Sequence, residues 1–453
     1  MFDKILIANR GEIAARIARS CKALGVATVG IHSDADEGAF HTRQVDASYR
    51  VGPAAVRESY MNVEAILAAA KASGARAVHP GYGLLSEKSH FAQAVLDAGL
   101  VWIGPPISAL EKVGDKMRAR HTAIAAGVSP VPGADAPVST VEEALAVLAV
   151  IGYPALVKAV GGGGGIGMQI VRDEAQLERA MKSCSDRAAQ AFGDARVYIE
   201  RYVERPRHIE VQIFGDTHGQ VVALGERECS LQRRHQKIVE ESPAPAFAGA
   251  DGAKKRAEIL DAAVRIGRAV GYVGAGTCEF IWDAARGEFY FLEVNCRIQV
   301  EHPVTEMVTG LDLVAMQLKV ASGEPLPPAF LDATPRGHAI EARLYAEDPA
   351  KGFIPKPGDV NELVWPTAEH LRIDAGVDAP GKVTPYYDPM IAKIIAWGET
   401  RAEAIARLDA ALAATQIAPL TTNQRFLRDV LVSEAFTAGA YDTTFAEQFA
   451  KRK

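Results

Sequence analysis

The sequence has few cysteines and no long apolar run. Its five cysteines are odd in number, lie far apart and lack the spacing of a metal site. This usage favours a reducing compartment, so we expect a cytoplasmic protein without disulfides. The most apolar run between charged residues, 144–157, is short and is broken by Gly152 and Pro154, so we expect no membrane span.

An excess of positive charge is also missing. The formal net charge of −6 argues against a surface for nucleic acid or for an anionic membrane. The first residues, MFDKILIANRGE, carry charges and too short an apolar run for a signal peptide. A length of 453 residues with 48% hydrophobic residues predicts two or three domains in one compact body.

The N-terminal part alternates strand and helix patterns. Residues 4–8, 27–32, 77–79 and 101–103 are predicted strands, and 12–24, 62–72 and 90–98 are predicted helices. Such alternation implies a parallel sheet whose loops face a ligand. No GxGxxG motif follows the first strand, so we do not expect dinucleotide binding there. In HPGYG, Tyr82 lies between two glycines and is expected to contact a ligand.

A glycine-rich segment follows an unusual lysine. Lys158 lies among apolar residues in the predicted strand 154–160, where an unpaired ammonium would be costly. The next residues, GGGGGIGM, can wrap backbone N–H groups around phosphate. We interpret the segment as a mobile nucleotide lid, and a flexible surface loop is the alternative.

The stretch 292–305, LEVNCRIQVEHPVT, alternates polar and apolar residues with the period of a strand. A solvated strand face is the simpler interpretation, but Asn and acidic residues are depleted in strands. Carboxylates, an amide and a guanidinium in one row can bind a divalent cation beside an oxyanion. The row consists of Glu293, Asn295, Arg297, Gln299 and Glu301.

Three other segments contribute charged or titratable side chains that could act together with this row. Glu279 lies on a strand that a short turn joins to it, so the two strands can share a hard cation such as Mg²⁺. A buried acid with a basic partner is the alternative for Glu279. His208 shares a strand face with Glu210 and Gln212, and is either a structural or a catalytic histidine. The segment 226–241 carries five basic side chains, which we expect to supply counter-charge, and a solvated charge run is the alternative. They are Arg227, Arg233, Arg234, His235 and Lys237.

In this order the motifs resemble those of biotin carboxylase, an ATP-grasp enzyme family, over nearly the whole chain. They are IANRGEIA, HPGYG, GDK, the glycine-rich lid, QRRHQK, GTCEF, EVNCRIQVEHPVTE, RGHAIEAR and YYDPMI. The resemblance implies a mixed α/β and α+β fold. Its parts would be an N-terminal parallel-sheet, Rossmann-like domain at 1–114, an ATP-grasp domain at 115–322 with a mobile lid at about 132–202, and a C-terminal α+β domain at 323–453.

The resemblance implies the first half-reaction of an acyl-CoA carboxylase. ATP with Mg²⁺ or Mn²⁺ would convert bicarbonate to carboxyphosphate, which would carboxylate biotin on a biotin carboxyl carrier protein. The expected partners are that carrier, a carboxyltransferase subunit and a second copy of the chain in a homodimer. The sequence has no Ala-Met-Lys-Met motif for biotin attachment. Either separate subunits exist or the chain is a fragment, and the final acceptor stays open.

The matched motifs also imply residue roles. ATP would contact Lys116, Lys158, Gly163, Gly164, Gly165, Glu200, Val203, His208, Gln232, His235, Glu279 and Glu293. The metal ligands would be Glu279, Glu293 and Asn295. Bicarbonate would lie against Lys237, Arg297, Gln299 and the backbone of Val300. Glu301 would be the general base, Arg343 would stabilise the biotin enolate, and Tyr82 would lie near the biotin ring.

Two alternatives stay open at this point. One is another ATP-grasp ligase that activates a different carboxylate for attack by an amine. The other is a nucleotide-binding subunit without turnover, because the lid has less positive charge than the family pattern. Ile166 and Gln169 stand where basic residues are expected, and Arg201 and Cys296 also depart from that pattern.

Overall fold

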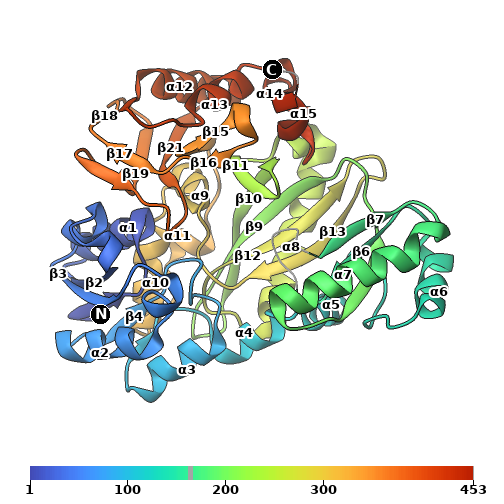
Figure 1. Cartoon of the computed structure of the whole chain (residues 1–453), viewed down its shortest axis with the longest axis horizontal. Coiled ribbons are helices and arrows are strands. Elements are labelled where there is room, and N and C mark those ends of the chain that lie inside the picture. The colour runs from blue at the N-terminus through green and yellow to red at the C-terminus, as the bar shows by residue number, and fades with distance from the viewer. Residues whose placement is uncertain (162–166, 452–453) are drawn as a thin grey trace.

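The computed structural model describes residues 1–161 and 167–451. Its N-terminal part is a parallel five-stranded sheet, as predicted (Figure 1). The strand order is β3 (Ala47–Gly52), β2 (Ala27–Ser33), β1 (Lys4–Ile7), β4 (Ala77–His79) and β5 (Val101–Trp102). Helices α1 (Gly11–Ala23), α2 (Val63–Ser73) and α3 (Ser89–Asp97) connect the strands. The edge strand β3 was missed because its first four residues are not buried and its hydrophobic pattern is weak.

The central element is an antiparallel eight-stranded sheet. Its order is β13 (Glu288–Asn295), β12 (Gly274–Asp283), β9 (Arg207–Gly215), β10 (Val221–Arg233), β11 (Gln236–Ser242), β14 (His338–Tyr345), β21 (Met390–Gly398) and β19 (Leu371–Ala375). The pairing of β11 with β14 joins the middle of the chain to its C-terminal part, with Val239 opposite Ala342. One continuous sheet therefore runs beneath both parts, and the domain limits given above remain a prediction.

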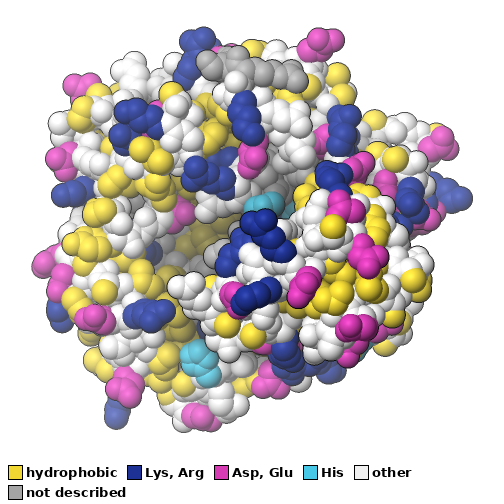
Figure 2. All heavy atoms as spheres, turned by 45° about the vertical axis from the view of Figure 1, so that its right-hand side comes forward, with side chains coloured by type: hydrophobic (Ala, Val, Ile, Leu, Met, Phe, Trp, Pro, Cys, Tyr) yellow, Lys and Arg dark blue, Asp and Glu magenta, His cyan; other side chains and the backbone are white. Residues whose placement is uncertain are grey.

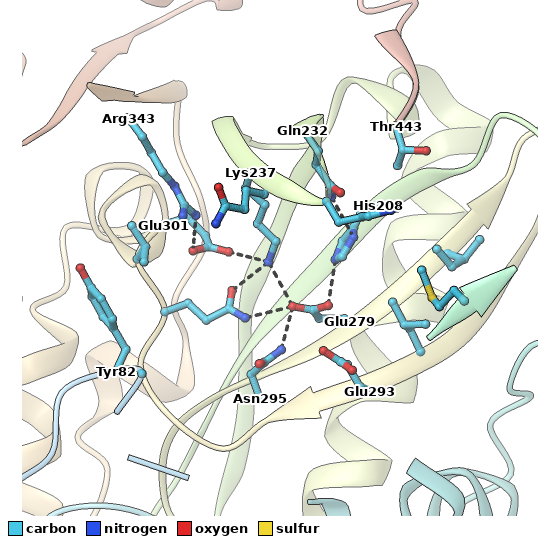
Figure 3. A pocket seen from close by; sticks show the side chains of 18 of the residues that line it. Tyr82, His208, Gln232, Lys237, Glu279, Glu293, Asn295, Glu301, Arg343 and Thr443 are labelled. Atoms are coloured by element: carbon cyan, nitrogen blue, oxygen red, sulfur yellow. Dashed lines mark hydrogen bonds and ion pairs between the residues drawn. The ribbon is translucent and has the colours of Figure 1, made fainter. Parts of the chain in front are cut away.

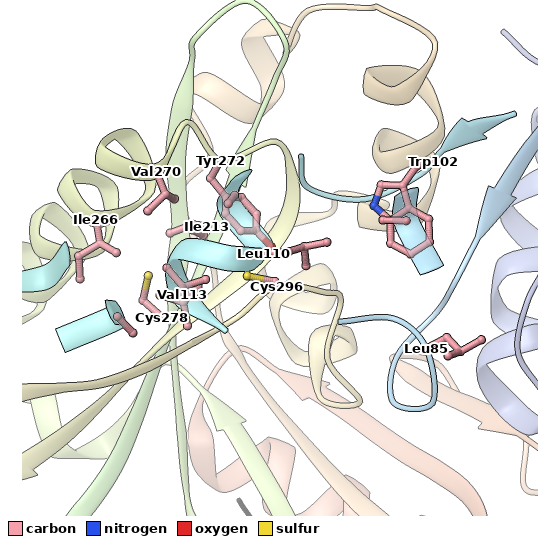
Figure 4. Close-up of a cluster of buried hydrophobic side chains, with 14 of the residues drawn as sticks. Leu85, Trp102, Leu110, Val113, Ile213, Ile266, Val270, Tyr272, Cys278 and Cys296 are labelled. Carbon is pink, nitrogen blue, oxygen red and sulfur yellow. The ribbon is translucent and has the colours of Figure 1, made fainter. Parts of the chain in front are cut away.

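Helices pack on this sheet or link it to the other parts. They are α4 (Ile107–Val113), α5 (Lys116–Ala125), α8 (Gly249–Val270), α9 (His302–Thr309), α10 (Leu313–Ala321) and α11 (Pro328–Leu331). The largest hydrophobic cluster packs Leu110 and Val113 of α4 against Ile266 and Val270 of α8 and against Ile213 of β9 (Figure 4). This packing fixes the N-terminal sheet relative to the central sheet. No helix in the described part of the chain is long and apolar enough to cross a membrane.

The lid is a small unit at the right of Figure 1. Its antiparallel sheet has the order β7 (Met168–Val171), β6 (Ala155–Ala159) and β8 (Val197–Arg201). Helices α6 (Val141–Ile151) and α7 (Leu177–Phe192) belong to the same unit and share its core. The predicted lid glycines Gly163, Gly164 and Gly165 lie outside the described residues, and so does Ile166.

The C-terminal part adds short strand pairs and helices to the end of the central sheet. The pairs are β15 (Glu347–Asp348) with β16 (Ile354–Pro355), β17 (Gly358–Val360) with β20 (Gly381–Val383), and β18 (Glu362–Val364) with β22 (Gln416–Ala418). The helices are α12 (Arg401–Ala414), α13 (Gln424–Leu431), α14 (Glu434–Thr437) and α15 (Phe445–Lys451). The helix predicted at 401–414 is confirmed.

The strand predicted over 292–305 is only partly right. Strand β13 ends at Asn295, residues 296–301 form a loop, and α9 begins at His302 with Pro303 in its first turn. The alternation persists in the loop because Cys296 and Ile298 are buried in hydrophobic clusters. The polar row therefore starts on a strand and continues on a loop.

Candidate functional site

A cavity of about 1160 Å³ lies where the N-terminal loops, the lid and the central sheet meet. Figure 2 shows a hollow near the middle of one face, with basic side chains beside it. Every described residue that the family motifs assigned to ATP, metal, bicarbonate or biotin lines this cavity. Arg227, Arg233 and Arg234, which were expected to supply counter-charge, do not line it. The structure therefore brings residues from all parts of the chain to one place.

Lys237 is the centre of the site (Figure 3). Its Nζ lies 3.0 Å from Glu279 Oε1 and 2.8 Å from Glu301 Oε1, and it also pairs with Glu210. Burial alone would lower the pKa of Lys237, but these carboxylates outweigh it and raise the pKa well above its ordinary value. Lys237 is therefore a permanent cation that links a pair of strand acids to the acid at the start of α9.

Glu301 also binds a guanidinium. Arg343 Nη2, on β14, lies 2.9 Å from Glu301 Oε2 and 2.5 Å from Glu240 Oε1. Burial would raise the pKa of Glu301, but Lys237 and Arg343 lower it below its ordinary value. Glu301 is therefore ionised and can accept a proton. Arg343 Nε is buried and has no hydrogen-bond partner among the described residues, so it can receive an acceptor from a ligand.

The acids on β12 and β13 form a second group. The strand register places Glu279 opposite Glu293 and Thr277 opposite Asn295, which confirms the predicted adjacency. Burial and then the neighbouring Glu279 raise the pKa of Glu293. Within the described part of the chain, Glu293 makes no hydrogen bond or ion pair, whereas Glu279 Oε1 accepts from Asn295 Nδ2 at 2.7 Å.

This group fits a hard divalent cation. Adjacent carboxylates, one buried and one half-buried, with an amide oxygen beside them are the oxygen ligands that Mg²⁺ prefers. A cation would also relieve the repulsion by Glu279 that helps to raise the pKa of Glu293. Other acids that lie close together do not need a metal. His208, Glu210 and Glu279 lie within 4.8 Å of one another, and so do Glu210, Cys229 and Glu301, but Lys237 pairs with all three glutamates.

His208 belongs to this charged network. Its Nε2 lies 3.0 Å from Glu279 Oε2 and its Nδ1 lies 3.1 Å from Gln232 Nε2. Burial would lower the pKa of His208, but Glu279 and Glu210 raise it to about 9. The two carboxylates therefore favour the protonated form of His208.

The other end of the cavity is lined by the lid and by α5. Lys158 Nζ pairs with Glu200 Oε1 at 2.8 Å, so Glu200 is the anion that this buried lysine needs in the structure. Lys116 follows the helix cap Asp115, and burial and then Lys158 lower its pKa. The other lining residues here are Val203, which is 8% exposed, Gln232 and the hairpin residue His235.

The segment 226–241 lies within the hairpin of β10 and β11 and is not a solvated charge run. Its turn residues Arg234 and His235 both have positive φ. The hairpin directs Lys237 inward, and it buries Arg227 completely, with Arg227 Nη2 at 3.1 Å from Glu210 Oε2. The alternation of 208–212 indicated that Glu210 shares a strand face with His208, but no sequence pattern showed that Glu210 pairs with both Arg227 and Lys237.

Arg297 is held by an acid that the sequence did not single out. Its Nε lies 3.4 Å from Glu87 Oε2, and its Nη2 donates to Asn295 Oδ1 at 3.0 Å. Glu87 also accepts from the backbone N–H of Cys296 at 3.0 Å, so it ties the N-terminal part to the loop 296–301. The departure at Cys296 lies in a hydrophobic cluster and leaves the polar row in place.

Tyr82 reaches the cavity from the loop after β4, on the side of Glu301 and Arg343 (Figure 3). Its hydroxyl donates to Glu12 Oε1. The loop requires its first glycine, because Gly81 has a φ of +63° and a Cβ there would lie 2.8 Å from Asn9 Nδ2. Asn9 Nδ2 in turn donates to the carbonyls of Pro80 and Tyr82, which explains the HPGYG motif.

Three protein families match the chain in succession. The family described as "Biotin carboxylase, N-terminal domain" matches residues 1–110, "Carbamoyl-phosphate synthase L chain, ATP binding domain" matches 115–329, and "Biotin carboxylase C-terminal domain" matches 341–448.

Curated relatives cover the whole chain. Biotin carboxylase 2 of Bacillus subtilis is 47% identical over 448 residues, which are 99% of this chain and 100% of that protein. The mitochondrial methylcrotonoyl-CoA carboxylase subunit alpha of Oryza sativa subsp. japonica is 48% identical over 99% of this chain. The match covers only 60% of that subunit.

Solved structures of similar proteins also match nearly the whole chain. A biotin carboxylase from Campylobacter jejuni has a TM-score of 0.95 and 41% identity, with 99% of both chains covered. The biotin carboxylase domain of Hydrogenobacter thermophilus 2-oxoglutarate carboxylase has a TM-score of 0.93 and 41% identity, with 99% of this chain and 98% of that chain covered. The chain therefore belongs to the biotin carboxylase family and is an ATP-grasp enzyme.

Proposed function

We propose that this chain carboxylates biotin on a biotin carboxyl carrier protein, with ATP and bicarbonate as the other substrates. The observation that carries the proposal is the position of Lys237. It pairs on one side with Glu279, beside the oxygen ligands for a metal, and on the other with Glu301, which Arg343 also holds. Lys237 thus links the proposed phosphoryl-transfer site at Glu279 to the candidate base Glu301, which also pairs with Arg343, the proposed partner of an oxyanion.

Bicarbonate would bind between Lys237, Arg297, Gln299 and the backbone N–H of Val300. It is a poor nucleophile, and its attack on ATP brings one anion against another, so positive charge must be in place before the reaction. Lys237 and Arg297 supply that charge. Glu301 would take the remaining proton of bicarbonate as its oxygen attacks the γ-phosphorus, which gives carboxyphosphate and ADP.

The nucleotide would lie along the lid side of the same cavity. Lys116 and Lys158 would hold its phosphates, and Glu200, Val203, His208, Gln232 and His235 would line its base and ribose. Glu279, Glu293 and Asn295 would hold Mg²⁺ or Mn²⁺, which when bound supplies charge stabilisation to the phosphates. These side chains align the γ-phosphoryl group with bicarbonate, which is most of what phosphoryl transfer requires.

Biotin would enter on the Tyr82 side. The ureido N–H of biotin must lose a proton before its nitrogen can attack carbon, and the oxygen of the ureido group then carries the negative charge. Arg343 would pair with this oxyanion through the N–H groups that the protein leaves available. The phosphate released from carboxyphosphate would accept the N–H proton, and the new bond joins the nitrogen to the carboxyl carbon.

The assembly is part of the proposal. The names of the relatives include carboxylase subunits for methylcrotonoyl-CoA and pyruvate, and the Hydrogenobacter structure is described as a dimer. We infer that this chain forms a homodimer in the cytoplasm and works with a biotin carboxyl carrier protein and a carboxyltransferase. The acceptor of the carboxyl group is then set by the carboxyltransferase, whose substrate this site does not contact.

The test is the transfer of labelled carbon from bicarbonate to biotin. Purified chain with MgATP, ¹⁴C-bicarbonate and free biotin should form acid-labile ¹⁴C-carboxybiotin, and omission of ATP should abolish it. The isosteric Glu301→Gln variant should fold and lose the transfer. Hydrolysis of ATP that is independent of bicarbonate, with no label on biotin, would instead support another ligase. A chain that binds ATP without turnover would support a regulatory subunit.

A further inference from the structure

Lys393 is a completely buried lysine that the reaction described above does not use. It lies on β21, directly opposite Arg343 of β14 in the strand register. A buried ammonium is costly unless it is paired and hydrogen-bonded. The groups that Lys393 contacts therefore indicate its role.

Among the described residues, the Lys393 ammonium has three oxygen neighbours within 4.0 Å. Its Nζ donates to the carbonyl of Val300 at 2.8 Å and lies 3.2 Å from Glu12 Oε1 and 3.8 Å from Asp374 Oδ2. Asp374 has other cations, since Arg372 Nη2 lies 2.6 Å from its carboxylate. Glu12 has no other cation within 4.0 Å in the part of the chain that the structure describes. Lys393 therefore neutralises the charge of Glu12 and fixes the carbonyl of Val300 by a hydrogen bond.

The hydrogen bond from Lys393 to the Val300 carbonyl orients the whole peptide between Val300 and Glu301. The peptide that joins Val300 to Glu301 is planar, so the direction of its carbonyl sets the plane from which the Glu301 side chain departs. Residues 296–301 form a loop without strand pairing, so no sheet hydrogen bonds fix this peptide. Lys393 therefore sets the direction of Glu301 and the orientation of the backbone beside it.

The bond to Glu12 reaches the other side of the cavity. Glu12 Oε1, which faces Lys393, also accepts the hydroxyl of Tyr82. Glu12 is 4% exposed and belongs to the first turn of α1, whereas Lys393 belongs to the C-terminal part of the chain. One ammonium thus connects the loop of Glu301 with the loop of Tyr82.

We propose that Lys393 is a positioning residue that aligns the bicarbonate and biotin sides of the cavity, by holding the Val300–Glu301 peptide and, through Glu12, the Tyr82 hydroxyl. The inference rests on the proposed function, because it takes Val300 and Glu301 as the bicarbonate side. Lys393 itself touches neither substrate.

The test compares Michaelis constants in Lys393→Met. A small displacement of aligned groups can cost about 100-fold, so the KM for bicarbonate should rise by about 10- to 100-fold. The KM for ATP should stay within about twofold, because the phosphate-binding lysines lie on other elements. Lys382→Met is the matched control, since Lys382 is 63% exposed on β20, and it should leave both constants unchanged.

A double variant separates positioning from a merely structural ion pair. Replacing both partners of a buried pair is often neutral for stability, whereas removing one partner is destabilising. Glu12→Gln with Lys393→Met should therefore refold to near wild-type stability and still show the raised KM for bicarbonate. If the double variant recovers the wild-type KM, or if Lys393→Met changes both KM values equally, the positioning role is wrong. If the wild type itself shows no bicarbonate-dependent phosphate release, the proposed function fails and this inference fails with it.

Discussion

Arg343 should matter much more for biotin than for bicarbonate. In the structure its Nη2 is already shared between Glu240 at 2.5 Å and Glu301 at 2.9 Å, and its Nε has no partner among the described residues. The guanidinium is therefore held in place before the substrate arrives, and a new oxyanion can pair with it without a large ordering cost. Arg343→Ala removes the proposed partner of the ureido oxyanion and leaves in place Lys237 and Arg297, the proposed binders of bicarbonate.

The size of the effect follows from these contacts. A hydrogen bond to a charged group contributes about 1.5–3 kcal/mol, which corresponds to roughly 10- to 150-fold in rate. The kcat/KM for biotin should fall by about this factor in Arg343→Ala. Loss of the guanidinium also leaves Glu240 and Glu301 buried with less positive charge, and removing one partner of a buried pair costs about 3–5 kcal/mol in stability.

The assay measures two activities in the same preparations, biotin carboxylation and bicarbonate-dependent release of phosphate. Arg343→Lys keeps the charge but loses the planar donor pair, so it should stay well below the wild type with biotin. Arg336→Ala, an exposed arginine just before β14, is the control and should change neither activity. Equal loss of both activities in Arg343→Ala, in protein shown to be folded, would refute the assignment.

Three further predictions concern the surrounding groups. Burial raises the pKa of Glu240 from 4.5 to about 7, so the free energy of unfolding should fall by roughly 3 kcal/mol as the pH rises from 4.5 to about 7. Thermal unfolding of Glu240→Gln from pH 5 to pH 8 should not show this fall. A variant with the same pH dependence as the wild type would contradict the prediction. Glu293→Gln removes a carboxylate from the cation group, so activity should require about 10- to 100-fold more Mg²⁺; an unchanged Mg²⁺ titration would exclude Glu293 as a ligand. Gly81→Ala puts a Cβ 2.8 Å from Asn9 Nδ2 in a left-handed backbone, so the melting temperature should fall and the KM for biotin should rise. Gly83→Ala has a similar left-handed φ but nothing within 4 Å of its Cβ, so its melting temperature should also fall while its KM for biotin stays unchanged.

The sequence predicted the contents of the site better than its geometry. Alternation identified Glu293, Asn295 and Glu301 as residues of one polar row, although the row leaves its strand after Asn295. The burial pattern continues through the loop because Ile298 packs into a core, and periodicity alone cannot distinguish the two cases. The parallel N-terminal sheet was predictable because each of its helices and inner strands has a local pattern.

The missed residues act through contacts between distant parts of the chain. Arg227 and Glu210 are separated by 17 positions, and Lys393 and Val300 by 93. A buried charge can be recognised in the sequence as an anomaly, but its partner is set by the pairing of strands. The hairpin of β10 and β11 shows the same point, since its basic residues resemble a solvated charge run until the fold turns Lys237 inward.

The origin of the oxygen in the released phosphate tests the central claim most directly. If bicarbonate attacks the γ-phosphorus while Lys237 and Arg297 hold it, the bridging oxygen of carboxyphosphate stays with phosphorus when the carboxyl group leaves. With ¹⁸O-bicarbonate, MgATP and biotin, each phosphate should then carry one ¹⁸O, measured by the isotope shift in its ³¹P NMR signal. Phosphate that takes its new oxygen only from water would show that bicarbonate is never phosphorylated at this site.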